Sequence, residues 1–216
     1  MLKIKPPCYR FCPFCGKKLQ VRIEEEKERK YCPSCEWTYY PHVAAAAGAI
    51  ILRNNKVLLV KRRREPYKDT WMFPAGFVDF GEHPLETATR EVAEETGLKI
   101  KNARLLNIIQ SVDDPRSPGH FVFFYEAPWA NAHGIFSALR RSEIPPKQNS
   151  SHSSTVLQPW FSAKADKVTV VGSKIKTDKE ENTEIAWFDI EKPPKIGWKS
   201  HQHMMKSIQK RAKIFV

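Results

Sequence analysis

Residues 76–98 read GFVDFGEHPLETATREVAEETGL, and this stretch decides the fold. Its second half is predicted to form a helix over residues 84–96. Pro84 suits the first turn of that helix, and Gly97 suits a stop at its C-terminal end.

The predicted helix carries three carboxylates, Glu91, Glu94 and Glu95, at positions i, i+3 and i+4. This spacing places them on one face. Three like charges so close would destabilise a bare helix, whereas a divalent cation would turn their repulsion into coordination. Ligands that are all oxygen suit Mg²⁺ or Mn²⁺, with substrate phosphates completing the shell. On acidic spacing alone, a solvated helix face would be the better interpretation.

The complete pattern removes that ambiguity. The stretch fits G-x₅-E-x₇-R-E-U-x-E-E-x-G-U, with U an aliphatic residue, at every specified position. It resembles the signature of the Nudix hydrolases. The resemblance implies an α/β fold, an α/β/α sandwich with a mixed central sheet. Glu82 and Arg90 are then expected to orient the metal ligands, and Gly76 and Gly81 to allow the loop geometry.

The family resemblance implies hydrolysis of a nucleoside diphosphate linked to another moiety. Metal ions would bridge the diphosphate, neutralise its charge and activate water for attack on phosphorus. The catalytic base is expected to be Glu91, within the motif, or Glu181, on a later loop. Glu184 competes with Glu181 for the second position, and an ordinary surface glutamate remains the alternative there.

A second motif precedes the first. Cys12 and Cys15 form one C-x₂-C pair, Cys32 and Cys35 form another, and 16 residues separate the pairs. Two C-x₂-C pairs at this separation predict a zinc site in which four thiolates complete a tetrahedral shell. Four ligands leave no open position, so this zinc is expected to be structural. Disulfides are the competing interpretation, which a cytosolic chain disfavours.

The two motifs predict two domains. Residues 1–40 are expected to form a zinc ribbon, too small to fold without its metal, and residues 41–216 a Nudix hydrolase domain. Within the second, residues 128–165 contain a proline pair and a serine-rich stretch, and are long for a loop. We expect an insertion or disordered loop there, with a lid as the alternative.

The remaining elements are predicted from apolar runs bounded by turn residues. Strands are expected over 43–52, 56–61, 105–109, 121–125, 168–171 and 185–188, and a basic helix over 199–213.

The substrate class is approached through local resemblances. The ribbon and residues 75–78, AGFV, resemble the NADH pyrophosphatase branch, but the S-Q-P-W-P-F-P-x-S signature of that branch is absent after the motif. Residues 114–120, DPRSPGH, resemble a stretch of some ADP-ribose pyrophosphatases. Other members with zinc ribbons act on flavin adenine dinucleotide. ADP-ribose is therefore the favoured substrate, NADH and FAD remain candidates, and AMP is the expected product.

Several residues are candidates for binding that substrate. Arg116 could contact a phosphate or the terminal ribose, although a plain turn explains it equally well. Among three aromatic residues near the motif, Phe73 is the candidate to stack on adenine, and core packing is the alternative. Gly76 is placed at the substrate by the motif. The basic run at residues 61–64 suits phosphate or a solvated turn.

Composition and charge bound the function classes. The 216 residues are 41% hydrophobic and 28% charged, which excludes collagen-like and fully disordered classes. The longest apolar run is far shorter than a membrane helix, and the N-terminus does not resemble a signal peptide, so we expect a cytoplasmic protein without membrane association.

The chain carries 36 lysines and arginines against 24 acidic residues, a net charge of +12 that favours anionic partners. A nucleotide substrate is the favoured partner. Two alternatives stay open: a nucleic-acid-binding regulator that uses the Nudix-like domain as a ligand sensor, and a hydrolase of RNA caps. Homodimers are common in the resembling branches.

Overall fold

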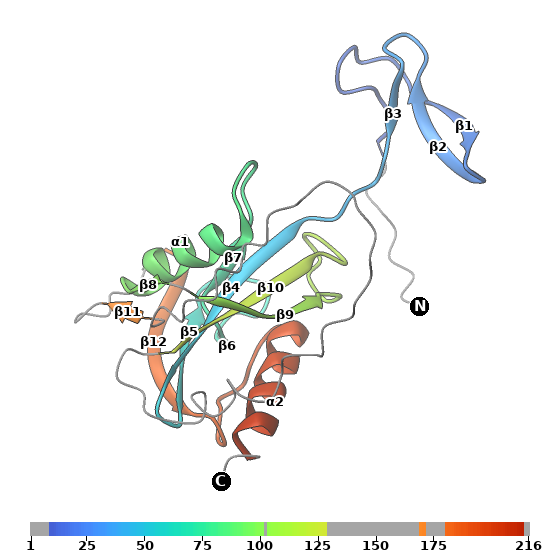
Figure 1. Cartoon of the computed structure of the whole chain (residues 1–216). Helices are drawn as coiled ribbons and strands as arrows, with labels where there is room; N and C mark the ends of the chain where they lie inside the picture. Colours follow the sequence, from blue (N-terminus) through green and yellow to red (C-terminus); the bar gives the residue numbers. More distant parts are fainter. Residues whose placement is uncertain (1–8, 102, 129–168, 172–179, 214–216) are drawn as a thin grey trace, which may run out of the picture.

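The computed structural model describes residues 9–101, 103–128, 169–171 and 180–213. Two parts are visible in Figure 1: a small three-stranded sheet near the N-terminus, and a larger body around a seven-stranded sheet. The chain leaves the small sheet and leads directly into a central strand of the larger one.

The small sheet is antiparallel throughout. Its strands are β1 (Gln20–Glu24), β2 (Lys27–Cys32) and β3 (Trp37–Tyr39). The first two form a hairpin whose turn residues, Glu25 and Glu26, have positive φ angles, so the charge run between the cysteine pairs is a solvated hairpin. Its apolar cluster contains little besides two cysteines, Leu19 and Trp37, which is the small core expected of a unit that a bound metal would stabilise.

The large sheet has strand order β12-β5-β4-β10-β9, while β6 pairs with β5 and β7 with β4. Strand β10 runs parallel to β4 and the other pairs are antiparallel, so the sheet is mixed. Its strands are β4 (Ala45–Arg53), β5 (Lys56–Arg62), β6 (Trp71–Met72), β7 (Ala75–Phe77), β9 (Arg104–Gln110), β10 (Phe121–Pro128) and β12 (Asn182–Asp189). A separate pair joins β8 (Lys99–Lys101) to β11 (Thr169–Val171).

Two helices, α1 (Pro84–Thr96) and α2 (Lys199–Lys213), cover the two faces of the large sheet (Figure 1). Successive residues of β4 alternate between them, as the two-residue period of a strand requires. Ile50 belongs to the apolar cluster of Met204 on α2, and Ile51 to that of Val92 on α1. The predicted α/β/α sandwich with a mixed sheet is confirmed.

Both predicted helices occur with the predicted bounds, and each predicted strand occurs with ends shifted by up to three residues. Strands β3, β6, β7 and β8 were not predicted, because they are two or three residues long and carry no periodic pattern. The expected insertion at 128–165 lies outside the described residues except for Pro128, which ends β10. Neither described helix is long and apolar enough to span a bilayer.

Candidate active site

Both ends of α1 are fixed by local interactions. His83 caps the first turn by accepting a hydrogen bond from the Leu85 amide, while Glu86 accepts one from the His83 amide at 2.9 Å. Gly97 ends the helix in the left-handed region at φ 69°. The acidic face is thereby held in a fixed rotation, with Glu91 and Glu95 turned inward and buried.

Gly76 has a different role from the one predicted. It lies in β7 and is not among the glycines with positive φ, whereas Gly81 is, at 83°. A Cβ atom at Gly76 would collide with the Glu91 carboxylate. Gly76 therefore leaves room for the Glu91 carboxylate beside β7 rather than supplying loop geometry, and Gly81 has the positive φ that the loop requires.

Arg90 connects the acidic groups. Its guanidinium donates to both carboxylate oxygens of Glu82 at 3.0 Å, to Glu91 Oε1 at 2.7 Å and to Glu94 Oε2 at 3.0 Å. The hydrogen bonds from Arg90 and Thr87 lower the pKa of Glu82 to about 2. This arrangement suits the expected orienting role of Glu82 and Arg90, because one cation fixes three carboxylates.

Glu95 is held by two other donors. The Ala75 amide reaches one carboxylate oxygen at 3.0 Å, and Asn182 Nδ2 on β12 reaches the other at 2.8 Å. Burial nevertheless raises the pKa of Glu95 to about 8, and burial also raises the pKa of Glu91. Both groups therefore sit where a nearby positive charge would favour their ionised forms.

The three carboxylates of the motif do not converge on one point. The Glu94 side chain is 53% exposed and directed to Arg90, and in the described part of the chain only a cysteine group has three or more potential ligand atoms within 4.8 Å of one another. As donors, Glu91 and Glu95 fit a hard divalent cation, since they are oxygen ligands buried with raised pKa values.

A cleft of about 250 Å³ opens beside Glu91. Three other predicted residues line it: Gly76 on β7, Arg116 on the β9–β10 connection, and Glu181 just before β12. Glu184 is not among its lining residues and instead pairs with Lys61 at 2.8 Å. Of the two glutamates considered outside the motif, Glu181 is the one placed at the cleft.

Arg116 is held in the cleft by an acidic neighbour and two rings. Its guanidinium donates to both carboxylate oxygens of Asp114, at 3.0 and 2.8 Å. It also lies over the rings of Phe77 and Trp198, at 5.4 and 5.5 Å from their centroids. The predicted turn at residues 114–120 thus directs a fixed guanidinium plane at the same space as Glu91.

The proposed stacking role of Phe73 is wrong. Its side chain is fully buried, packs at 5.9 Å from the ring of Phe124 and at 5.6 Å from that of His201, and is absent from the cleft lining. No face of the Phe73 ring remains for adenine. Phe77, which directly follows Gly76 in β7, is the aromatic residue of the motif that lines the cleft.

Sequence reasoning missed several lining residues. Arg62 and Arg64 belong to the basic run whose phosphate role was left open. Trp198, directly before α2, and His201, in its first turn, lie about 100 residues after the motif, and no local pattern links them to it. For His201 the available signal was its position in the first turn of a predicted helix, and Trp198 lies just outside that helix.

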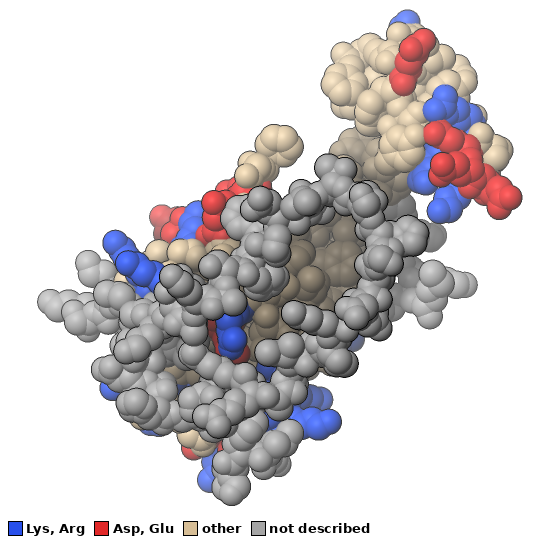
Figure 2. All heavy atoms as spheres, in the orientation of Figure 1, with Lys and Arg blue, Asp and Glu red and all other residues tan. Residues whose placement is uncertain are grey.

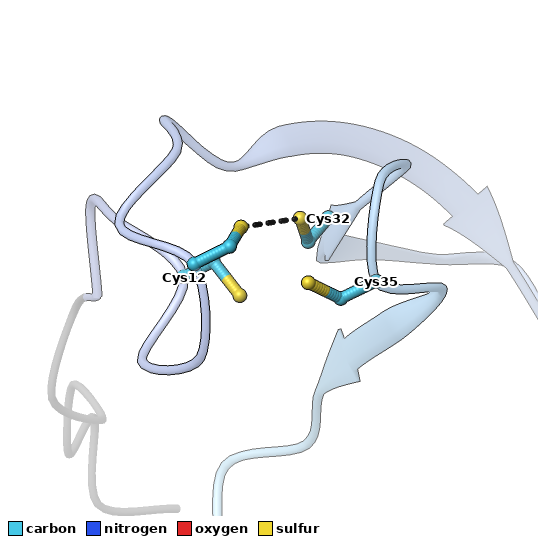
Figure 3. A group of neighbouring side chains, drawn as sticks. Cys12, Cys32 and Cys35 are labelled. Atoms are coloured by element: carbon cyan, nitrogen blue, oxygen red, sulfur yellow. Dashed lines mark hydrogen bonds between the residues drawn. The ribbon is translucent and has the colours of Figure 1, made fainter.

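The four predicted zinc ligands do converge. Figure 3 shows the sulfur atoms of Cys12, Cys32 and Cys35 facing a common centre from two turns, and the Cys15 and Cys32 sulfurs are 3.6 Å apart. A tetrahedron with Zn–S bonds of about 2.3 Å requires about 3.8 Å between sulfurs. Burial raises the pKa of Cys32, but hydrogen bonds with the backbone of Cys35 and Ser34 outweigh it and lower that pKa to about 7. This geometry fits a bound zinc ion.

Family models match both parts of the chain. The model described as NUDIX domain matches residues 42–165, more than half of the chain, and a zinc-ribbon model described as Nudix N-terminal matches residues 10–41. The chain belongs to the Nudix family.

Known relatives agree with this assignment. The chain is 39% identical over 108 residues to an ADP-ribose pyrophosphatase of Methanocaldococcus jannaschii, an alignment that covers 50% of this chain and 60% of the relative. It is 30% identical over 168 residues to the mitochondrial NAD(P)H pyrophosphatase NUDT13 of Mus musculus, covering 70% of this chain and 47% of the relative. An NAD-capped RNA hydrolase, NudC of Chromobacterium violaceum, is 37% identical over 98 residues, covering 44% of this chain and 35% of the relative. The matched part thus spans less than two thirds of each relative.

Solved structures share the fold. A NUDIX hydrolase from Nitrosomonas europaea superposes with a TM-score of 0.62 at 19% identity, covering 95% of this chain and 91% of its own. The NUDIX domain of Shewanella oneidensis NrtR, solved with ADP ribose, superposes with a TM-score of 0.52 at 17% identity, covering 84% of this chain and 93% of its own.

Proposed function

We propose that the protein is a metal-dependent pyrophosphohydrolase that cleaves a nucleoside diphosphate linked to another moiety and releases AMP. ADP-ribose is the favoured substrate, ahead of NADH and FAD. The observation that carries this proposal is the cleft, which brings the carboxylates of Glu91 and Glu181 together with the guanidinium of Arg116. Anionic metal ligands beside a fixed cation suit a substrate whose reacting group is a diphosphate.

The carboxylates of the motif would hold the catalytic cation, Mg²⁺ or Mn²⁺. When bound, the ion supplies charge neutralisation at the diphosphate and activation of water. Glu91 and Glu95 approach the site from the buried face of α1, and Glu94 supports it from the exposed side through Arg90. Glu181 is the favoured base, because it lines the cleft and no ion pair occupies it among those formed by the described residues.

Two groups would bind the rest of the substrate. Arg116 presents a planar fork whose orientation Asp114 fixes in advance, so less side-chain freedom is lost when a phosphate or ribose oxygen binds. Phe77 lies beneath that guanidinium and lines the cleft. Together they form a flat, cationic wall for an ADP-linked group.

The test is a panel assay with Mg²⁺ or Mn²⁺ over ADP-ribose, NADH, FAD, diadenosine polyphosphates and nucleoside triphosphates, with products identified. We expect AMP from ADP-ribose with the highest kcat/KM. Preference for triphosphates would contradict the substrate class and leave hydrolysis of phosphoanhydrides standing. No cleavage of any member with either metal would contradict the enzyme itself.

A second candidate, hydrolysis of NAD-capped RNA, is favoured by relatives that bear this name and by the net charge of +12. The ribbon gives it no further support, because its visible face in Figure 2 carries acidic and basic side chains together, and within the ribbon Arg22 pairs with Glu24 at 2.8 Å. A surface of one sign would suit RNA better. Adding a short NAD-capped RNA to the panel separates the two: cap hydrolysis predicts a higher kcat/KM for it than for free NADH.

A further inference from the structure

The first turn of α2 presents two polar side chains whose distal atoms have no described partner. Ser200 and His201 are 3% and 4% exposed, and both line the cleft. The Phe73 amide donates to His201 Nδ1 at 3.2 Å, but neither the Ser200 hydroxyl nor His201 Nε2 forms a hydrogen bond within the described residues. In this part of the chain, no side-chain nitrogen or oxygen is both fully buried and unpaired. The two atoms therefore reach solvent, and the cleft is the space that both line.

The His201 ring is fixed as a hydrogen-bond donor. It stacks on Phe73 at 5.6 Å and meets Phe124 edge-on at 5.1 Å, so it cannot swing away. Because Nδ1 accepts the Phe73 amide, the proton of the neutral ring resides on Nε2. Burial lowers the pKa of His201 to about 3, and the charge of Arg62 acts in the same direction. At neutral pH, Nε2–H is thus an uncharged donor.

Arg62 adds a positive charge beside these donors. Its Nε donates to the Pro66 carbonyl at 3.0 Å and its guanidinium lies 5.4 Å from the Trp198 ring centroid. Burial lowers the pKa of Arg62, and so does the nearby charge of Arg116. Among the ion pairs of the described residues, none involves Arg62, whereas Arg116 pairs with Asp114. Arg62 is therefore a half-buried cation that lines the cleft and forms no direct ion pair within the described residues, although the charges of Glu95, Glu181 and Asp114 lie near enough to act on it.

We propose that Arg62, Ser200 and His201 form a phosphate-binding subsite at the α2 end of the cleft. The set offers two neutral donors and one cation, and the amide groups of the first turn of a 15-residue helix strengthen the preference for an anion. Asp113 already accepts from the Lys199 amide at 2.9 Å, and the Gln202 amide donates to the Trp198 carbonyl, so these two amides are not available to the subsite. The phosphoryl oxygens come from the scissile diphosphate or from a further phosphate on the substrate. That a substrate uses this phosphate-binding subsite rests on the proposed function.

Binding is tested first with inorganic phosphate as the probe. The full, zinc-loaded chain is titrated by calorimetry without added Mg²⁺ or Mn²⁺, so no turnover is needed. Ser200→Ala and His201→Asn should each weaken phosphate binding by at least about threefold, and Arg62→Gln by about tenfold or more. Asparagine keeps an acceptor for the Phe73 amide while it removes the distal donor. Ser207→Ala, on the same helix but outside the cleft lining, is the matched control and should bind as the wild type does.

Equal phosphate affinity in the wild type, Ser200→Ala and Arg62→Gln, with unchanged circular dichroism, would overturn the subsite. The same result follows if Ser207→Ala weakens binding as much as Ser200→Ala. Because Ser200→Ala removes a single hydroxyl, it keeps the test decisive if Arg62→Gln or His201→Asn fails to fold.

Two substrates then distinguish the source of the phosphate. The kcat/KM of Ser200→Ala and Arg62→Gln is compared for ADP-ribose and ADP-ribose 2′-phosphate. Equal losses for both assign the subsite to the scissile diphosphate, and a loss confined to the second assigns it to an additional phosphate. If neither substrate is cleaved by the wild type but the variants still lose phosphate binding, the subsite stands and the proposed function fails. If both are cleaved and no variant changes phosphate binding or kcat/KM, the function stands and the subsite fails.

Discussion

The zinc ribbon and the cleft collect their ligands in opposite ways. In the ribbon, four cysteine sulfurs lie within 4.8 Å of one another and come from two short turns. At the cleft, the carboxylates of α1 are spread apart, with Glu94 held outside by Arg90 and Glu95 held inside by Asn182. Four thiolates around one ion would form a closed shell with no position left for chemistry, whereas the acidic groups beside the cleft are kept apart and the space between them is open.

The difference explains where stability and activity should reside. A closed site of four thiolates contributes folding free energy to a small apolar cluster. The open site instead lowers stability when its carboxylates are ionised, since burial raises the pKa values of Glu91 and Glu95 above their ordinary range. Changes in the ribbon should therefore appear in stability, and changes at the cleft in turnover.

The largest effect is expected at the acidic face of α1. Glu94→Gln and Glu95→Gln should each lower turnover at saturating Mg²⁺ by at least about 10²-fold, because each keeps the shape and removes a negative charge: Glu95 as a ligand, Glu94 as the carboxylate that holds Arg90. Steady-state kinetics on ADP-ribose measures this. Glu184→Gln is the control, since Glu184 pairs with Lys61 outside the cleft, and its turnover should stay within about twofold of the wild type. Near-normal turnover in both test variants would refute the metal assignment.

The next largest effect is expected at Arg116, which lines the cleft together with Phe77. Arg116→Ala should lower kcat/KM for ADP-ribose about ten- to a hundredfold, since a charge-assisted contact is worth about 1.5–3 kcal/mol. The dependence of the rate on Mg²⁺ should not change, because Arg116 contacts Asp114 rather than the motif. An unchanged kcat/KM for every dinucleotide would contradict a binding role for Arg116.

The ribbon should behave in the opposite sense. Purified protein should contain about one zinc per chain, and Cys32→Ser should lose it, because a buried ligand of a closed shell is removed. Metal analysis with thermal unfolding should show a lost or weakened ribbon transition, while kcat on ADP-ribose falls by less than about fivefold. A folded, reduced wild-type sample without zinc would contradict the site.

The smallest effect is a pH dependence of stability at Glu82. Arg90 and Thr87 lower the pKa of Glu82 from an ordinary 4.5 to about 2. A depressed carboxyl pKa stabilises the fold fully above 4.5, and this contribution is lost as the pH falls from 4.5 toward 2. The difference in unfolding free energy between the wild type and Glu82→Gln should therefore shrink across that interval. If that difference in unfolding free energy stays constant from pH 6 to pH 3, the contact between Glu82 and Arg90 does not stabilise the fold.

Local sequence patterns predicted the features that depend on residues close together in the chain. The bounds of α1 followed from Pro84 and Gly97, and the cysteine site followed from the spacing of its two C-x₂-C pairs. Phe73 shows the limit, because its place in the core depends on Phe124 and His201, which lie far along the chain.

The cleft could be predicted only in part for the same reason. The motif identified Glu91, and short resemblances identified Arg116 and Glu181. No local pattern pairs Asn182 with Glu95 or brings Ser200 toward the motif, since these contacts arise when β12 and α2 pack on the sheet.

Hydrolysis of ADP-ribose in H₂¹⁸O, with Mg²⁺ and mass analysis of the products, tests the central claim most directly. The account predicts equal amounts of AMP and ribose 5-phosphate, with one ¹⁸O atom in the phosphate of one product, because water attacks phosphorus. Intact ADP-ribose with either Mg²⁺ or Mn²⁺, or cleavage without label in a phosphate group, would contradict it.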